Sequence, residues 1–188
     1  MTPIVYLIIA IAAFLLLYYV VPWTAGAYLR YRGKMLVTCP ETRKPAAVSV
    51  DVAHAVLTAG LGKPDLRLSS CSRWPEREGC GQECLDQIEV APQACMLRTI
   101  VSDFYKGKSC VYCGRRFEDI EWRSHKPSLM NPGGATIQWD QVRPEALPGV
   151  LATHSPVCWN CHVTQTFCRE HPDLVIFDRR KAAGAQRR

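Results

Sequence analysis

Two short Cys-x2-Cys motifs are the residues of this chain best suited to chemistry. The first is Cys110-Val111-Tyr112-Cys113-Gly114, and the second is Cys158-Trp159-Asn160-Cys161-His162. A two-residue spacer lets both sulfurs of a tight turn face one ion. The two pairs therefore predict a tetrahedral four-thiolate site, with zinc as the first candidate. Iron bound as in rubredoxin is an alternative, because the same sulfurs would hold it. The predicted ligands are Cys110, Cys113, Cys158 and Cys161.

The second motif also matches the attachment signature of c-type haem. In Cys-x2-Cys-His, the two thiols bind the vinyl groups of the porphyrin and the histidine ligates iron. Here these residues would be Cys158, Cys161 and His162. Three residues are available as a second axial ligand: His154, His171 and Met130. Haem c requires export and leaves Cys110 and Cys113 without a role, so the choice between zinc and haem depends on the compartment.

The start of the chain bears on that compartment. No charged side chain occurs from Met1 to Leu29, and 12 of the 18 residues from Ile4 to Val21 are Ile, Leu, Val or Phe. This stretch is long enough to cross a bilayer core. At about 0.3 to 0.6 kcal/mol per apolar residue, its insertion is favourable by roughly 4 to 7 kcal/mol. The sequence therefore predicts a single transmembrane anchor over residues 1–29.

Basic residues follow the predicted span, whereas none precedes it. They are Arg30, Arg32, Lys34, Arg43 and Lys44. The positive-inside tendency then places the amino end outside and the following domain in the cytoplasm. A cleaved signal peptide is the alternative, since Ala25-Gly26-Ala27 offers the small residues that a peptidase needs. Signal peptides, however, carry positive charge before their apolar core, and this chain does not.

The cysteine content and the charge agree with a small anchored protein. The chain has ten cysteines among 188 residues and a net charge of +6. Such a cysteine content suggests disulfides in a secreted chain, and metal binding or catalysis in a reducing cytoplasm. Part of the charge lies at the carboxyl end, which has no apolar period. We expect residues 178–188 to be a basic disordered tail that either solubilises the chain or attracts anionic lipid or nucleic acid.

A second group of cysteines precedes the Cys110 motif. Its members are Cys71, Cys80, Cys84 and Cys95. Cys80 and Cys84 are four positions apart, so a helix from Gly81 onward would place their sulfurs on one face. Together with Cys39 and Cys71 they form a candidate second metal site. The spacing matches no zinc or iron–sulfur pattern, and free thiols or disulfides are the alternatives.

The patterning after the anchor predicts an α+β fold. We expect a cysteine-containing α+β region over 30–106 and a zinc-binding region over 107–177. The expected elements are a β-hairpin over 35–38 and 47–50 with Cys39 at its turn, a helix over 52–59 capped by Asp51, helices over 85–90 and 96–105, a turn at 131–134, a strand at 137–139 and a helix over 163–170.

Further residues lie between the two Cys pairs in a recognisable order. Ser124-His125-Lys126-Pro127 comes first, and Pro132-Gly133-Gly134 follows it. With the Cys pairs, this order resembles the zinc-stapled form of the His-Asn-His endonuclease domain, a treble-clef fold, over residues 110–165. In that family a Cys pair begins a β-hairpin, a histidine acts as general base, and a second Cys pair opens a helix. The resemblance implies that His125 is the base of a metal-dependent nuclease.

The chain departs from that family at its catalytic positions. In that family an acidic residue usually precedes the histidine, but Ser124 stands there in this chain. The family also has a central Asn, for which Asp140 and Gln141 are the nearest candidates here. A divalent ion beside His125 would therefore lack a ligand. A closed four-thiolate site stabilises a fold and does no chemistry. We expect a zinc-ribbon or treble-clef-like scaffold that docks a protein partner at the membrane, with a membrane-anchored c-type cytochrome and a nuclease as alternatives.

Overall fold

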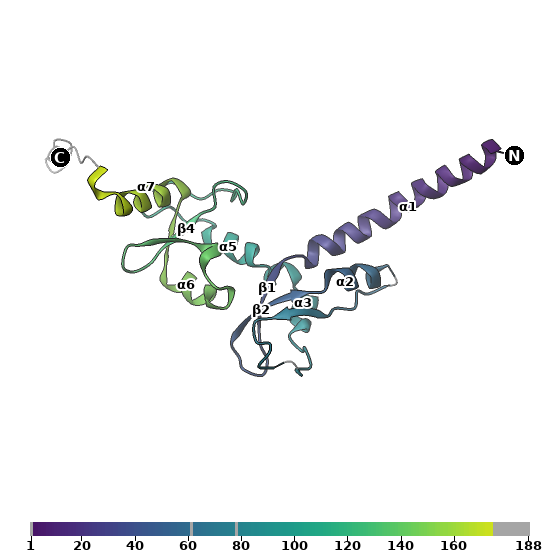
Figure 1. Cartoon of the computed structure of the whole chain (residues 1–188), viewed down its shortest axis with the longest axis horizontal. Coiled ribbons are helices and arrows are strands. Elements are labelled where there is room, and N and C mark those ends of the chain that lie inside the picture. The colour runs from purple at the N-terminus through teal and green to yellow at the C-terminus, as the bar shows by residue number, and fades with distance from the viewer. Residues whose placement is uncertain (1, 61, 78, 175–188) are drawn as a thin grey trace. The chain divides into compact units, whose positions relative to one another are not determined.

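The chain folds into two compact units. The computed structural model describes residues 2–60, 62–77 and 79–174 (Figure 1). Unit 1 is Met1–Asp103 with Pro144–Ala146, and unit 2 is Phe104–Arg143 with Leu147–Arg188. Both units mix helices and strands, as the patterning predicts. The predicted basic tail, residues 178–188, lies outside the described residues.

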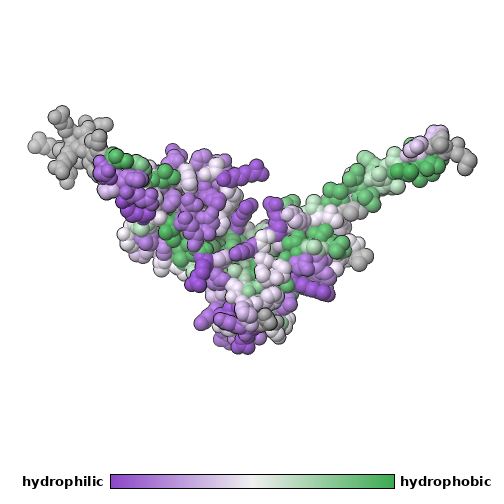
Figure 2. All heavy atoms as spheres, in the orientation of Figure 1, coloured by the Kyte–Doolittle hydropathy of each residue, from purple (hydrophilic) through white to green (hydrophobic). Residues whose placement is uncertain are grey.

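Unit 1 begins with the long apolar helix α1 (Thr2–Tyr31). Its first charged side chain is Arg30, and Pro22 lies inside the helix without ending it. The helix is long and apolar enough to cross a membrane by its length and composition. Figure 2 shows hydrophobic residues along this helix. The apolar side chains of the candidate span are exposed to solvent.

A three-stranded antiparallel sheet follows the helix. Its strands are β1 (Lys34–Thr38), β2 (Pro45–Val50) and β3 (Leu68–Cys71), in the order β1-β2-β3. The predicted hairpin is confirmed, with Met35 paired to Val48 and Thr38 paired to Pro45. Alternate residues point to opposite faces of a strand. Met35 and Val48 are accordingly buried together on one face of the sheet.

Four helices complete unit 1 and lead into unit 2. They are α2 (Val52–Ala59), α3 (Leu85–Val90), α4 (Pro92–Cys95) and α5 (Leu97–Tyr105). Asp51 caps α2 as predicted, because its carboxylate accepts a hydrogen bond from the backbone N–H of His54 at 3.0 Å. The helix expected over 85–90 is confirmed as α3, and it does not extend back to Gly81, so Cys80 and Cys84 do not share one helix face. Gln82 has a φ of 56°, which interrupts a helix, and Cys84 is the N-cap of α3.

The core of unit 1 includes the last residue of α1. Tyr31 is 4% exposed and packs in one cluster with side chains of the sheet and of α3. The other members of this cluster include Met35, Val37, Val48, Leu68 and Ile88. The apolar helix also contacts α2. The end of α1 is therefore an integral part of the folded unit.

Unit 2 is built on a second small sheet. Its strands are β4 (Ser128–Met130), β5 (Thr136–Gln138) and β6 (Ser155–Val157), in the order β5-β4-β6. The helices α6 (Leu147–Thr153) and α7 (Trp159–Glu170) complete it. The strand expected at 137–139 ends at Gln138, where a 3-10 turn over Trp139–Gln141 begins. The helix expected over 163–170 begins earlier, at Trp159, because Cys158 already acts as its N-cap.

A buried tyrosine fixes the beginning of unit 2. The side chain of Tyr105 is fully buried, and its hydroxyl donates to the carbonyl of Ser128 at 2.7 Å. The ring of Phe117 packs on it at 4.8 Å between centroids. Ser109 and Arg116 form an isolated antiparallel bridge just beyond Tyr105. These contacts position the segment that carries the first Cys pair.

Candidate metal centre

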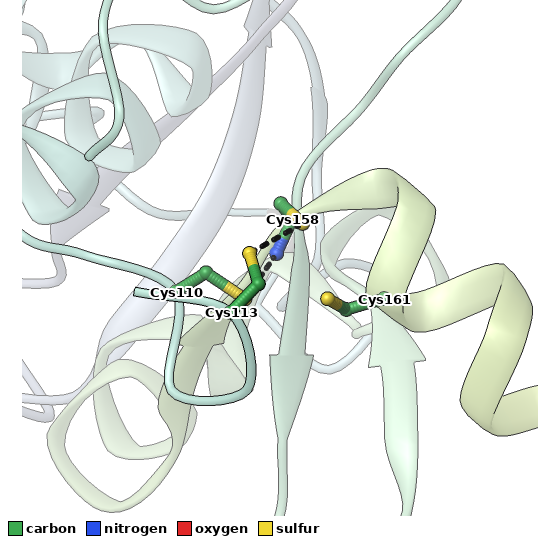
Figure 3. A group of neighbouring side chains, drawn as sticks. All are labelled: Cys110, Cys113, Cys158 and Cys161. Carbon is green, nitrogen blue, oxygen red and sulfur yellow. Dashed lines mark hydrogen bonds between the residues drawn. The ribbon is translucent and has the colours of Figure 1, made fainter. Parts of the chain in front are cut away.

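The first Cys pair lies on one tight turn. The backbone N–H of Cys110 donates to the carbonyl of Arg115 at 2.9 Å, and the N–H of Gly114 donates back to the carbonyl of Cys110 at 2.9 Å. Gly114 has a φ of 71°, a left-handed conformation that costs glycine nothing. The turn therefore brings Cys110 and Cys113 to the same side of the backbone (Figure 3).

The second Cys pair lies at the start of α7. Cys158 is the N-cap of this helix, and Cys161 lies in its first turn. The N-terminal end of a helix carries partial positive charge and favours thiolates. The N–H of Val111 donates to the carbonyl of Pro156 at 3.1 Å, so the first turn is held against β6, which leads directly into α7.

The four predicted sulfurs come together in space (Figure 3). Their atoms all lie within 4.8 Å of one another, and Cys113 Sγ is 3.7 Å from Cys158 Sγ. With zinc–sulfur bonds of about 2.3 Å, tetrahedral geometry sets the sulfurs about 3.8 Å apart. The arrangement could therefore hold a metal ion. Among the described residues, no other group of three or more ligating side chains is this close.

The thiols of this cluster differ in their tendency to ionise. Burial opposes ionisation of Cys110, but the N–H groups of Cys158, Cys113 and Tyr112 outweigh it and lower the pKa of Cys110 to about 6. The pKa of Cys161 is raised, first by burial and then by the neighbouring thiols. The pKa of Cys158 is also raised, chiefly by burial. The Cys110 thiolate therefore forms readily, whereas Cys158 and Cys161 need a cation to offset the accumulated charge.

His162 does not join the sulfur cluster. Its side chain is 8% exposed, and its Nδ1 lies 2.9 Å from the hydroxyl oxygen of Thr136 on β5. Burial, followed by the charge of Arg169, lowers the pKa of His162. The ring is therefore packed as a neutral polar group between α7 and the sheet. The sequence alone did not predict that His162 is a buried packing residue, because a histidine after Cys-x2-Cys is also typical of haem attachment.

The residues of the candidate second site lie in unit 1. Cys39, Cys71, Cys80 and Cys84 line one cavity of about 50 Å³. Burial, and then the charges of Cys71 and Cys80, raise the pKa of Cys84 to about 11. The four sulfurs are less close than those of unit 2, since they do not form a group within 4.8 Å. Cys95 does not line this cavity.

His125 lies in a cleft of unit 2 that borders the sulfur cluster, because Cys158 is also part of its lining. Its Nδ1 is 3.1 Å from a carboxylate oxygen of Glu121 and 3.0 Å from the hydroxyl oxygen of Ser124. The cleft has a volume of about 620 Å³, and its lining includes Arg115, Arg116, Glu121, His125, Trp159 and Asn160. A carboxylate therefore does lie next to His125, although it comes from Glu121, four positions earlier, and not from the preceding residue. Residues four apart meet on a helical turn, and that spacing was the missed signal.

Asp140 and Gln141, the two candidates for the central Asn of the His-Asn-His domain, form hydrogen bonds that do not involve His125. Asp140 accepts a hydrogen bond from Lys126 Nζ at 2.7 Å. The side chain of Gln141 accepts one from the backbone N–H of Gln138 at 3.4 Å. Neither hydrogen bond involves His125, so these residues do not complete a catalytic site around it.

Comparisons of this chain with family models, curated proteins and solved structures find no match. The resemblance to the His-Asn-His domain therefore depends on the sequence motifs alone. A cluster of four cysteines is common to several unrelated zinc folds and does not by itself identify that family.

Proposed function

We propose that this protein is a membrane-anchored zinc protein whose extramembrane part docks a partner protein. In this proposal α1 spans the bilayer, and unit 2 is a treble-clef-like domain built on zinc at Cys110, Cys113, Cys158 and Cys161. The observation that carries the proposal is the convergence of these four sulfurs within 4.8 Å. Four thiolates leave no open coordination position, so the ion contributes to folding and does not act on a substrate.

The membrane anchor is supported by the composition of α1. Its apolar side chains are exposed in the folded chain, and the helix has no charge before Arg30. An exposed apolar surface of this length is costly in water and favourable in a bilayer. The basic residues after it favour an amino end outside and a cytoplasmic domain. A reducing cytoplasm would keep the cysteines as thiols, as zinc binding requires.

The docking role is supported by apolar residues on the surface of unit 2. Val111 and Tyr112, the two residues between the first Cys pair, are 46% and 40% exposed. On α7, Val163 and Phe167 are similarly exposed and lie one turn apart. Apolar side chains held on a rigid metal-stapled turn lose little entropy on binding, which suits them to contact a protein partner.

Metal analysis of the full-length chain in detergent tests this proposal. The protein is expected to be colourless and to contain zinc, and Cys113→Ser should lose the zinc of unit 2 and increase protease sensitivity. Cys168→Ser is the matched control, because Cys168 lies on α7 outside the sulfur cluster. A red protein with the sharp visible band of haem would replace this proposal by a membrane-anchored c-type cytochrome. A reporter fused after Arg188 measures the orientation and should read cytoplasmic.

A nuclease activity is the second candidate, favoured by the Glu121–His125 pair in a cleft that also contains Arg115 and Arg116. A carboxylate orients an imidazole as a general base, and arginines attract phosphates. Incubation with DNA and a divalent ion tests it. Cleavage that is lost in His125→Ala and kept in His154→Ala, a histidine outside the cleft, would establish this activity in place of a purely structural role.

A further inference from the structure

We propose that unit 1 holds a second zinc ion, bound by the thiolates of Cys39, Cys71, Cys80 and Cys84. This site lies in the other compact unit and goes beyond the proposed function, which depends on the cluster of unit 2. The four cysteines share one cavity, Cys39 lies on a turn like that of Cys110, and buried hydrogen-bond donors line the cavity.

The sheet of unit 1 brings two of the four cysteines to one face. Cys71 ends β3 and pairs with Val48, whose side chain is buried. Cys39 follows β1 two positions after Val37, which is buried on the same face. Cys84, at the start of α3, packs in the core cluster that this face forms. All four cysteines line the cavity of about 50 Å³ between these elements, a volume sufficient for an ion.

The turn at Cys39 has the same hydrogen bonds as the turn at Cys110. The N–H of Cys39 donates to the carbonyl of Lys44, five positions on, at 2.9 Å, and the N–H of Arg43 donates to the carbonyl of Cys39 at 2.8 Å. In unit 2 the corresponding bonds of Cys110 are 2.9 Å each. The chain thus contains two turns with the same hydrogen-bond pattern. In the turn of unit 2 the first cysteine, Cys110, belongs to the candidate metal centre.

Arg43 strengthens this correspondence. It has a φ of 53°, and Gly114 has a φ of 71° at the equivalent position. The left-handed conformation is unfavourable for a residue with a side chain. A residue kept in this conformation indicates that the shape of the turn itself is required. Thr42 occupies the position of Cys113, so this turn supplies one sulfur and the remaining three come from elsewhere in the unit.

Buried hydrogen-bond donors surround the cavity without a partner. The side chains of Arg73 and Trp74 line it, and Arg73 Nε and Trp74 Nε1 have no hydrogen-bond partner among the described residues. The backbone N–H of Arg73 donates to Cys71 Sγ at 3.4 Å. A zinc ion with four thiolates carries a net charge of −2, and its sulfurs accept N–H hydrogen bonds. Arg73, in the lining, offers positive charge to such a centre, whereas Arg77 is paired with the carboxylate of Glu41 at 3.5 Å.

Ion binding at this site requires the segment around Cys80 to move, because the four sulfurs do not form a group within 4.8 Å of one another. Gly79 and Gly81 flank Cys80, and a side chain at either position would meet no close backbone neighbour. Glycine gives the backbone access to conformations that other residues avoid. Metal binding is coupled to local folding, so the ion is expected to draw Cys80 toward the other three sulfurs.

Counting zinc in the full-length chain tests this inference. After loading with Zn²⁺ under reducing conditions and removal of excess, we expect two zinc ions per wild-type chain and one per chain in Cys80→Ser. The matched control Cys95→Ser, a buried cysteine of the same unit outside the cavity, should keep two. Cys113→Ser reports on unit 2 separately, so the two sites can fail independently. One zinc per wild-type chain, unchanged by Cys80→Ser, would overturn the second site.

A labelling experiment covers the case in which Cys80→Ser does not fold. Cys80 is partly exposed, so its alkylation by iodoacetamide in the wild-type chain reports its environment directly. Bound zinc is expected to slow this alkylation at least tenfold, and a strong chelator should restore the rate. Equal rates with and without chelator would reject the site. A disulfide between any two of the four cysteines in the isolated protein would reject it as well.

Discussion

The backbone N–H of Cys158 donates to Cys110 Sγ at 3.3 Å, across 48 positions of sequence. This bond joins the start of α7 to the first Cys turn, and it is one of the contacts that lower the pKa of Cys110 to about 6 against the effect of burial. Cys110 therefore ionises more readily than an ordinary thiol. Burial raises the pKa values of Cys158 and Cys161, so these thiols keep their protons until a cation replaces them.

Zinc affinity of unit 2 should consequently depend on pH. Binding displaces protons from at least Cys158 and Cys161, so the dissociation constant is expected to rise about 100-fold for each pH unit of acidification near neutrality. Competition with a chromophoric chelator, in buffers from roughly pH 6.5 to 8, measures how the dissociation constant depends on pH. The Cys80→Ser chain isolates unit 2 for the titration. An affinity independent of pH would contradict the proposed thiolate ligation.

Removing a ligand should destabilise unit 2 far more than removing a neighbouring cysteine. Structural zinc contributes about 10 to 16 kcal/mol of binding free energy in small domains, and much of this is folding free energy. Cys110→Ser is expected to abolish the cooperative unfolding transition of unit 2. Cys168→Ser should leave it within about 0.5 kcal/mol. Limited proteolysis followed by mass spectrometry measures both variants, and equal stability of the two would count against a metal centre.

Tyr105→Phe should reduce the free energy of unfolding by about 1 to 3 kcal/mol, because it leaves the buried carbonyl of Ser128 without its donor. Tyr112→Phe is the matched control. Its hydroxyl donates to the carbonyl of Gly134 at 3.3 Å in an exposed position, where water can replace it. Denaturant unfolding followed by fluorescence measures both changes. A larger loss for Tyr112→Phe would be inconsistent with the buried anchor.

His162 should titrate below its ordinary pKa of 6.5, because burial and then the charge of Arg169 disfavour the imidazolium. On acidification the unfolded chain binds this proton at a higher pH than the folded chain does. The contribution of His162 to the free energy of unfolding is therefore complete above pH 6.5, and it is lost as the pH falls from there through the folded pKa. NMR titration of the ring protons measures the value, and His162→Asn assigns the signal. Arg169→Met should raise the pKa of His162, and an unchanged or lower value would argue against the contribution of Arg169.

Thr42→Cys tests the equivalence of the two turns. The substitution converts Cys39-Pro40-Glu41-Thr42 into a Cys-x2-Cys pair on a turn that already has the hydrogen bonds of the Cys110 turn. In the Cys80→Ser background it is expected to restore the second zinc equivalent, since it supplies the missing sulfur. Glu41→Cys, in which the new thiol stands one position out of register, is the control and should not restore it. Restoration by Glu41→Cys alone would show that the two turns differ.

Features encoded by short sequence spacing could be predicted, whereas features set by a single backbone angle could not. Two sulfurs in Cys-x2-Cys are brought together by their own turn, so each Cys pair follows from local sequence. The meeting of the two pairs depends on the contact of the first turn with β6. The cap at Asp51 follows from an equally local rule. Gln82 has a positive φ, which prevents a helix there. Glutamine seldom adopts this conformation, so the sequence pattern did not predict it.

The side-chain contacts of His125 and His162 could not be predicted from the sequence either. The Glu121 carboxylate reaches His125 because the intervening residues form a turn, although no apolar periodicity marks a helix there. His162 is buried because α7 begins four residues before the predicted start, which turns its ring toward Thr136. The environment of these residues depends on where an element begins, and that is the least certain feature of any sequence pattern.

The burial of Tyr31 in the core of unit 1 has a mechanical consequence. The apolar helix ends inside a folded body, so no slack tether separates the two. Tilt or rotation of α1 within a lipid layer would be transmitted to β1, whose first residue follows three positions later. In the proposed membrane-anchored state the helix would act as a lever arm, and a change in bilayer thickness would reorient the cysteine-lined cavity of the same unit.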